Sequence, residues 1–405
     1  MISFDNTETA FAYKNNNELK SAKFLFSVMG NNFLVNLGLK LIPGAIKNKI
    51  PLTKTILFKT IFPQFVGGET LEETAPVVEK LSKYNVNVIM DYGVEGGHDG
   101  EKGFDDATDQ FIKVINYIST QPHIPFMSIK ITGIARFALL EKIDSQMDNG
   151  ESTLIKRYHS VIESLSENDK SEWNKVVMRI FKICETAKNK GVGVLIDAEE
   201  TWIQDPVDAL TMLMMDTFNK NKAIVYNTLQ LYRHDRIIFL EESFEAANNR
   251  KFILGVKLVR GAYMEKERER AKEKGYPSPI QPDKKSCDLD YDLAVKMCIE
   301  KINFVSVIIA SHNENSNLQA TILMKDAGLN NDHSMIHFSQ LYGMSDHITF
   351  NLSKENYNVS KYLPFGPLKD VIPYLMRRAE ENSSVSGQTG RELSLIKKEL
   401  KRRNS

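Results

Sequence analysis

The sequence predicts an α/β protein, a distorted (β/α)8 barrel of the TIM type with a helical extension at its N-terminus. Apolar runs of strand length recur from about residue 85 onward, and each is followed by a longer stretch with helical periodicity. That order is typical of parallel strands joined by helices. The runs are continuously apolar rather than alternating, which indicates strands covered on both faces. Eight such units favour a closed barrel over an open sheet.

The eight runs divide the chain into three regions. They lie at residues 85–92, 126–132, 192–197, 223–230, 252–259, 305–311, 335–341 and 357–364. We therefore expect an N-terminal helical region (1–65), the barrel (66–385) and a basic C-terminal tail (386–405). Within the first region, residues 17–49 predict two short amphipathic helices with breaks near Gly30 and Pro43. The tail ends in LIKKELKRRNS and is expected to be solvated.

Composition excludes several classes of protein. The 405 residues suit one barrel with an extension, and 42% hydrophobic with 26% charged residues is ordinary for a globular protein. No apolar run has the length of a membrane-spanning helix. Lys and Arg balance Asp and Glu at 52 each, which argues against nucleic-acid binding.

The cysteines and the N-terminus indicate the compartment. Cys184, Cys287 and Cys298 are scattered and lack the paired spacing of disulfide frameworks or thiolate metal sites. The opening residues MISFDNTETA have the character of neither a secretory signal nor a transit peptide. We therefore expect a cytoplasmic protein.

Polar residues gather at the carboxyl ends of the predicted strands. This is the face on which barrel enzymes place their chemistry. Any one of these residues is explained as a strand terminator that meets solvent, whereas their recurrence on most strands indicates a shared site. They are Asp91, Lys130, Asp197, Glu199, Gln230, Lys257, Ser311, His312 and Gln340.

The segment GVKLVRGAYMEKERERA, residues 255–271, has the features of an anion-binding turn. Lys257 and Arg260 lead into Gly261 and Ala262, whose small side chains let a bulky or phosphate-bearing ligand approach the backbone. Two cations beside such a turn suit an anionic cofactor. The charged run that follows is expected to be a solvent-exposed helix face.

The segment KYLPFGPLKDVIPYLMRRAEEN, residues 361–382, places cations beside an aromatic ring. Tyr374, Arg377 and Arg378 stand at i, i+3 and i+4, so they share one side of the predicted helix. Guanidinium groups suit a small carboxylate, because each offers a planar fork to its two oxygens. Arg377 and Glu381 also have the spacing of an ordinary surface ion pair, and spacing alone does not decide between the two interpretations.

The segment LIDAEETW, residues 195–202, ends an apolar run in three carboxylates. Asp197 and Glu199, with His312, would suit a divalent metal. No second histidine has ligand spacing to them, and the other histidines are scattered singly, as structural ones are. The chain contains neither the glycine fingerprint of a Rossmann dinucleotide site nor a P-loop.

Taken together, these segments resemble the proline dehydrogenase family. The matching motifs are VKLVRGAY, YLPFGP with PYLMRRAEEN, LIDAEE, SIKITG, DYGVEG (residues 91–96) and SHN, which appear in the family's order within about residues 85–385. The resemblance implies a barrel that holds FAD without a Rossmann unit. It further implies oxidation of L-proline to 1-pyrroline-5-carboxylate by hydride transfer from C5 to FAD N5, the first step of proline catabolism to glutamate. A membrane quinone is the implied electron acceptor.

The resemblance also implies roles for individual residues, by motif position. Asp197 and Lys257 are the implied catalytic residues, although some branches of the family carry Arg in place of Lys257. The implied substrate-binding residues are Lys130, Tyr263, Leu341, Tyr362, Tyr374, Arg377 and Arg378. The implied cofactor-binding residues are Ala198, Gln230, Lys257, Arg260, Gly261, Ala262, Ser311 and His312. No metal is implied.

Three alternatives stay open at this point. A 4-hydroxyproline dehydrogenase of the same family needs room for an added hydroxyl, which the phenol of Tyr362 would crowd. A metal-dependent barrel hydrolase would use Asp197, Glu199 and His312. A flavin-free binding module would have no need of the arginine pair. The N-terminal helices either pack on the barrel or make peripheral contact with the inner face of a membrane.

Overall fold

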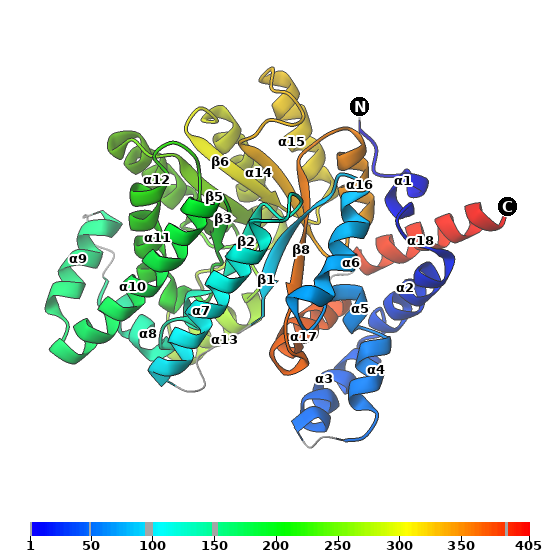
Figure 1. Cartoon of the computed structure of the whole chain (residues 1–405), viewed down its shortest axis with the longest axis horizontal. Helices are drawn as coiled ribbons and strands as arrows, with labels where there is room; N and C mark the ends of the chain where they lie inside the picture. Colours follow the sequence, from blue (N-terminus) through cyan, green and yellow to red (C-terminus); the bar gives the residue numbers. More distant parts are fainter. Residues whose placement is uncertain (1, 48–49, 94–99, 148–152, 385–387) are drawn as a thin grey trace. The chain divides into compact units, whose positions relative to one another are not determined.

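Eight short segments form strands, and these close into a barrel in chain order (Figure 1). The structure is a computed structural model that describes residues 2–47, 50–93, 100–147, 153–384 and 388–405. The predicted fold class and all eight predicted strand positions are confirmed. The strands are β1 (Asn87–Tyr92), β2 (Phe126–Ile129), β3 (Gly193–Ile196), β4 (Val225–Gln230), β5 (Leu254–Val259), β6 (Val305–Ala310), β7 (Ile336–Leu341) and β8 (Val359–Phe365).

The strands form where branched apolar residues are continuous. Every residue of β3 (GVLI) and β4 (VYNTLQ) is buried, as expected for strands covered on both faces. The second predicted strand was too long at its carboxyl end. Residues Ile131–Gly133 form a 3-10 turn, η1, so the strand stops before Lys130.

The chain forms two compact units, one of residues 1–94 with 338–405 and the other of residues 95–337. In the first unit β8 pairs in parallel with β1 and with β7. The helices of this unit are α1 (Thr7–Phe11), α2 (Asn16–Met29), α3 (Asn32–Lys47), α4 (Thr53–Lys59), α5 (Phe62–Phe65), α6 (Leu71–Ser82), α16 (Asp346–Lys354), α17 (Leu368–Ser384) and α18 (Gln388–Asn404).

The second unit contains the parallel pairs from β2 through β6. Its longest helix, α10, ends at Lys190 and is capped by Gly191, whose left-handed conformation (φ 71°) lets the chain turn into β3. The helices of this unit are α7 (Gly100–Ile118), α8 (Phe137–Gln146), α9 (Leu154–Ser164), α10 (Glu167–Lys190), α11 (Gln204–Phe218), α12 (Arg236–Arg250), α13 (Met264–Lys274), α14 (Lys284–Glu300) and α15 (Glu314–Asp326), with the 3-10 turn η2 (Thr201–Ile203).

The N-terminal segment is helical, as predicted, but one predicted break is wrong. The break near Gly30 is confirmed, because α2 ends at Met29 and α3 begins at Asn32. Helix α3 then continues through Pro43 to Lys47. A proline inside a helix removes one backbone hydrogen bond while its fixed φ still suits helical geometry, so it weakens a helix without always ending it.

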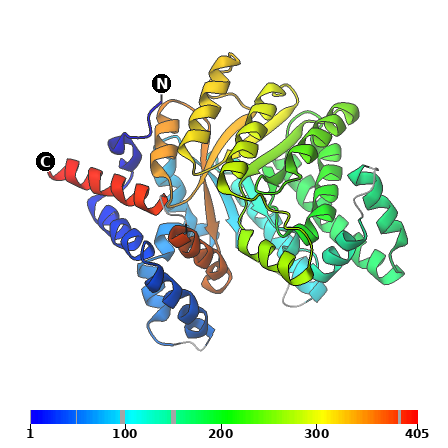
Figure 2. The same ribbon diagram turned by 180° about the vertical axis from the view of Figure 1, so that it is seen from behind.

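The C-terminal segment is not the solvated tail that its charge suggested. Residues 388–404 form α18, which buries Leu395, Ile396 and the carboxylate-bearing Glu399. Arg403 anchors it by donating hydrogen bonds to the carbonyls of Phe11 and Lys14, each 2.8 Å long. Figure 2 shows the last helix beside the first ones. Residues 385–387, where the tail was predicted to begin, lie outside the described residues, and the three predicted boundaries stay predictions.

One bent pair of helices among the described residues has, when combined, the length and apolar composition of a membrane span. In the described part of the chain, no single helix has the length and apolar composition to cross a bilayer. Residues 16–29 and 33–42 satisfy that test only when taken together, across a bend of 94°.

Candidate active site

Asp197, the first residue after β3, lies among three donors from other strands. Lys257, from β5, forms an ion pair with its Oδ1. Ser128, from β2, donates a hydrogen bond to the same oxygen over 2.5 Å. The ammonium of Lys130, directly after β2, is 3.9 Å from Oδ2. These side chains converge because β2, β3 and β5 present their carboxyl ends at one face of the parallel sheet.

The two lysines keep Asp197 ionised. Burial alone would raise the pKa of the carboxyl group, but the charges of Lys257 and Lys130 and the hydrogen bonds from Lys257 and Ser128 lower it below its usual range. Asp197 is therefore an anion at neutral pH, suited to holding cations rather than to donating a proton.

The three carboxylates of LIDAEE do not converge on a common point. Asp197 contacts the two lysines, Glu199 accepts hydrogen bonds from Thr132, and Glu200 pairs with Lys266. Among the described residues, no group of three His, Cys, Asp or Glu side chains has metal-binding geometry. Two ammonium groups beside Asp197 also oppose a divalent cation electrostatically. Asp197, Glu199 and His312 thus do not form the metal site of the hydrolase alternative.

Arg260 follows β5 and is held by three acceptors. Its guanidinium donates to Asp288 (2.7 Å), Ser311 (2.7 Å) and Ser316 (2.8 Å). It also lies over the ring of Tyr291, 4.3 Å from the centroid. A guanidinium has five N–H donors, and these bonds use three of them. The side chain is therefore fixed in place and still retains donors for an anion.

Gly261 has a backbone conformation that requires glycine. Its φ is 132°, and a Cβ atom there would come within 2.5 Å of the Tyr232 ring. Glycine thus lets the turn after β5 lie against the Tyr232 ring. The predicted close approach of a ligand to this backbone stays a prediction. Gly261 and Ala262 are exposed, while Tyr263 is half-buried.

The residues of β4 have polar atoms that suit a flavin. Gln230 is buried, and its amide oxygen has no hydrogen-bond partner among the described residues; the same holds for the hydroxyl of Thr228. A buried acceptor without a donor is costly, and the isoalloxazine ring carries an N–H that suits it. With the cations Lys257 and Arg260 on the neighbouring strand, this donor and acceptor set fits FAD.

The other unit carries the arginine pair on α17. Arg378 is buried, donates to Glu381 over 2.6 Å and lies 5.0 Å from the centroid of the Tyr374 ring. Tyr374 and Arg378 thus share one helix face, as predicted. Glu381, which the spacing had paired with Arg377, bonds to Arg378. Burial raises the pKa of the Tyr374 phenol well above its usual value.

The remaining predicted residues occupy strand ends or follow them. Leu341 ends β7 and Tyr362 lies within β8, both half-buried. Ala198 is buried after Asp197, and His312 is half-buried after Ser311. In the motif DYGVEG, residues 94–96 lie outside the described residues. No contact settles the roles assigned to these residues, which stay predictions.

Sequence reasoning missed several members of the site. Ser128 lies inside β2 and carries no signal besides a polar residue in an apolar run. Asp288 and Ser316 bond to Arg260 from helices far along the chain. The charged helix after Tyr263, expected to be exposed, buries Glu267, which accepts two hydrogen bonds from Thr201. Periodicity does not reveal such partners, because α13 is charged on every face.

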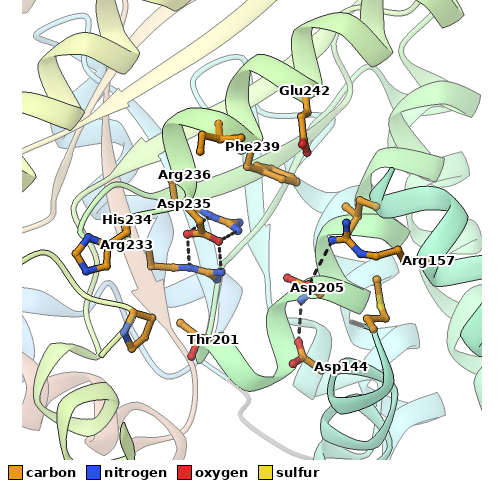
Figure 3. A pocket seen from close by; sticks show the side chains of 14 residues that line it. Asp144, Arg157, Thr201, Asp205, Arg233, His234, Asp235, Arg236, Phe239 and Glu242 are labelled. Atoms are coloured by element: carbon orange, nitrogen blue, oxygen red, sulfur yellow. Dashed lines mark hydrogen bonds and ion pairs between the residues drawn. The ribbon is translucent and has the colours of Figure 1, made fainter. Parts of the chain in front are cut away.

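A separate pocket of about 500 Å³ lies in the second unit, and Figure 3 shows its lining. Asp235 accepts hydrogen bonds from Arg233 and Arg236, and the Asp144 carboxylate accepts the Asp205 backbone N–H (3.0 Å). None of the predicted site residues lines this pocket.

Comparisons with known proteins point to one family. A family model described as "Proline dehydrogenase" matches residues 74–391. The chain is 31% identical over 427 residues to "Proline dehydrogenase 1, mitochondrial" of Dictyostelium discoideum, covering 98% of this chain and 74% of that protein. It is 32% identical over 362 residues to the hydroxyproline dehydrogenase of Xenopus laevis, covering 85% and 78%.

A solved structure shares the fold. The crystal structure of proline utilization A from Bdellovibrio bacteriovorus, inactivated by N-propargylglycine, matches with a TM-score of 0.69 and 21% identity. The match covers 96% of this chain and 40% of that longer one. At this identity the likeness supports the fold alone.

Proposed function

Because the chain belongs to the proline dehydrogenase family, we propose that it oxidises L-proline to 1-pyrroline-5-carboxylate with FAD, the first step of proline catabolism. The observation that carries this proposal is the buried Asp197 with Lys130 and Lys257 around it. This cluster holds the two lysine ammonium groups in place at the carboxyl ends of barrel strands.

FAD fits the second unit and would supply the hydride acceptor, taking hydride from C5 of proline at its N5. Lys257 and Arg260 would bind the anionic cofactor, and the Gln230 amide oxygen would accept from the flavin ring. Ala198, Gly261, Ala262, Ser311 and His312 complete the proposed cofactor contacts. With FAD bound, Lys257 would supply positive charge that favours the negative charge of the reduced flavin.

The substrate carboxylate is the proposed ligand of three cations. Arg377, Arg378 and Lys130 would bind it through charge-assisted hydrogen bonds, which fix the ring so that its C5 hydrogen is oriented. Tyr263, Leu341, Tyr362 and Tyr374 would form the apolar wall around the ring. Asp197 holds Lys257 and Lys130 in place. The amine must be neutral when it reacts, because its lone pair drives hydride loss.

We further propose a membrane quinone as the electron acceptor. The support is a group of exposed apolar side chains on α2, α3, α4 and the residues between them: Phe24, Phe33, Leu34, Leu37, Leu41, Ile50, Leu52 and Ile56. Lys23, Lys40 and Lys54 lie among them in sequence. Apolar residues with interspersed lysines suit peripheral binding to an anionic bilayer. Cosedimentation with vesicles rich in phosphatidylglycerol tests this, and no binding at low salt contradicts it.

Substrate preference tests the main proposal against hydroxyproline oxidation. Because the relative from Xenopus laevis is named a hydroxyproline dehydrogenase, the competing substrate to test is trans-4-hydroxy-L-proline. We expect kcat/KM for L-proline to exceed that for hydroxyproline by at least about tenfold, because the bulky phenol of Tyr362 would crowd the added hydroxyl. Product is measured by trapping the cyclic imine with o-aminobenzaldehyde. A preference for hydroxyproline would replace the proposal.

A further inference from the structure

A side chain connects the segments that follow β2 and β3, beyond the last backbone hydrogen bond between these two strands. The backbone pairing finishes where the Asp197 N–H donates to the Ile129 carbonyl over 2.9 Å. Beyond the ends of the two strands, three residues after Ile129 and two after Asp197, a side chain continues the connection. The Glu199 carboxylate accepts hydrogen bonds from the Thr132 N–H (3.2 Å) and the Thr132 hydroxyl (2.6 Å).

Lys130 lies between these two connections. The residue before it is held by the sheet, and Thr132, two residues after it, is held by Glu199. The Lys130 carbonyl also accepts the Gly133 N–H over 3.1 Å, which closes the η1 turn. Asp197 contacts the ammonium of Lys130. Thus Asp197 orients the side chain, while Glu199 fixes the backbone from which that side chain projects.

Glu199 is itself held rigidly. Its side chain is buried, and its own N–H donates to the Gln204 amide oxygen over 2.9 Å. Burial raises its pKa to about 7, with the Glu200 charge acting in the same direction and with Lys130 and the Thr132 bonds opposing it. A buried carboxylate costs free energy, and both of its oxygens accept hydrogen bonds from Thr132, which lies within the η1 turn directly after Lys130.

We propose that Glu199 is a positioning residue for Lys130, acting through the paired hydrogen bonds to Thr132. The inference rests on the proposed function, in which Lys130 binds the substrate carboxylate. Glu199 touches neither substrate nor cofactor in this role. Its loss displaces the ammonium from the carboxylate while leaving the flavin side of the site intact.

The first test is Glu199→Gln in the FAD-loaded enzyme. The amide oxygen can still accept the Thr132 N–H, but the amide NH2 can bond the Thr132 hydroxyl only with that hydroxyl as acceptor, so the neutral side chain holds Thr132 less strongly than the carboxylate does. We expect KM for proline to rise about three- to tenfold and kcat to stay within about twofold. Thr132→Val, which removes only the hydroxyl bond, should shift KM in the same direction by a smaller factor. Glu185→Gln, at an exposed position of α10, is the matched control and should match the wild type.

The decisive test is a double-mutant cycle with Lys130. In a Lys130→Met background the ammonium is gone, so Glu199→Gln should raise KM by less than about twofold. The dissociation constant of tetrahydrofuran-2-carboxylate, a proline analogue without an amine, should follow the same pattern and report the carboxylate contact alone. Flavin absorbance and thermal unfolding confirm that each variant is folded and loaded, and Thr132→Val replaces Glu199→Gln if that variant loses FAD.

Equal KM increases with and without Lys130, or no increase in either Glu199→Gln or Thr132→Val, would overturn the positioning role. Either result would leave the proposed function unchanged, because the wild type would still oxidise proline. A wild-type enzyme that leaves proline unchanged would instead remove the proposed function and, with it, this inference.

Discussion

Lys257 and Asp197 form a buried ion pair that joins β5 to the end of β3, with side chains 6% and 13% exposed. The two residues are far apart in the sequence. Ser128, within β2, and Lys130, directly after β2, complete the cluster. A buried pair of this kind costs desolvation, so each partner depends on the other. The first prediction follows from that dependence.

Lys257→Met should destabilise the fold as well as slow catalysis. Removing one partner leaves the Asp197 charge with weaker compensation, which typically costs about 3 kcal/mol of unfolding free energy. Because the folded pKa of Asp197 is lowered, its contribution is present above its unfolded pKa and is lost as pH falls through the folded value. Urea unfolding at pH 7.5 measures the effect. Lys272→Met, at an exposed position of α13, is the control, and equal stability of the two variants would refute the prediction.

Asp144→Asn should stabilise the protein at high pH only. Burial and the nearby Asp205 charge raise the pKa of Asp144 to about 7, and Figure 3 shows the Asp144 carboxylate bonded to the backbone N–H of Asp205. An acid with a raised folded pKa favours folding at low pH, and that contribution is lost between about pH 4 and pH 7 as the unfolded chain ionises first.

The asparagine oxygen still accepts the Asp205 N–H, so the substitution removes the charge without removing the bond. We expect a gain of about 1–2 kcal/mol in unfolding free energy at pH 8 and no gain at pH 4. Thermal unfolding at the two pH values measures the difference, and a gain of equal size at both would argue against the electrostatic cause.

Gly261→Ala should cost more than an ordinary glycine substitution in the left-handed region. Its Cβ would overlap the Tyr232 ring, in addition to the unfavourable φ of 132°. We expect a loss of at least about 2 kcal/mol together with reduced FAD content. Gly275→Ala is the matched control, because φ there is 74° and nothing lies within 4 Å of the added Cβ. If both variants lose about 1 kcal/mol, the close approach to Tyr232 has no energetic role.

Arg378→Ala and Arg377→Ala should each raise KM for proline by at least about tenfold while FAD stays bound, the usual cost of losing a charge-assisted contact. Arg378 is already oriented by Glu381 and the Tyr374 ring. Steady-state kinetics with proline measures the effect, and Lys369→Ala, at an exposed position of the same helix, is the control. Unchanged KM in both arginine variants would contradict the carboxylate contact.

The strands could be predicted because a strand that is buried on both faces is continuously apolar in sequence. Continuous apolar runs such as that of β6 (VSVIIA) have no other simple explanation. Polar positions at or near their carboxyl ends, such as Asp197 and Lys130, were predictable for the same reason, although the second predicted strand ran past Lys130. The helices at the chain ends were harder, because charge dominates the composition of α18 while Leu395 and Ile396 are buried among its charged residues.

The partners of the site residues were not predictable from spacing. Thr132 and Glu199 are 67 residues apart in sequence, and their bonds depend on the register of β2 against β3. Asp288 reaches Arg260 from the first turns of α14. Such partners become visible only once the fold fixes which strand ends and helix faces meet.

The central claim is that the protein carries FAD that proline reduces, and the visible spectrum of the purified protein tests it most directly. We predict flavin absorbance near 450 nm that bleaches on anaerobic addition of L-proline and is unaffected by an equal concentration of D-proline. A colourless protein after supplementation with FAD, or a flavin spectrum that excess L-proline leaves unchanged, would contradict the account.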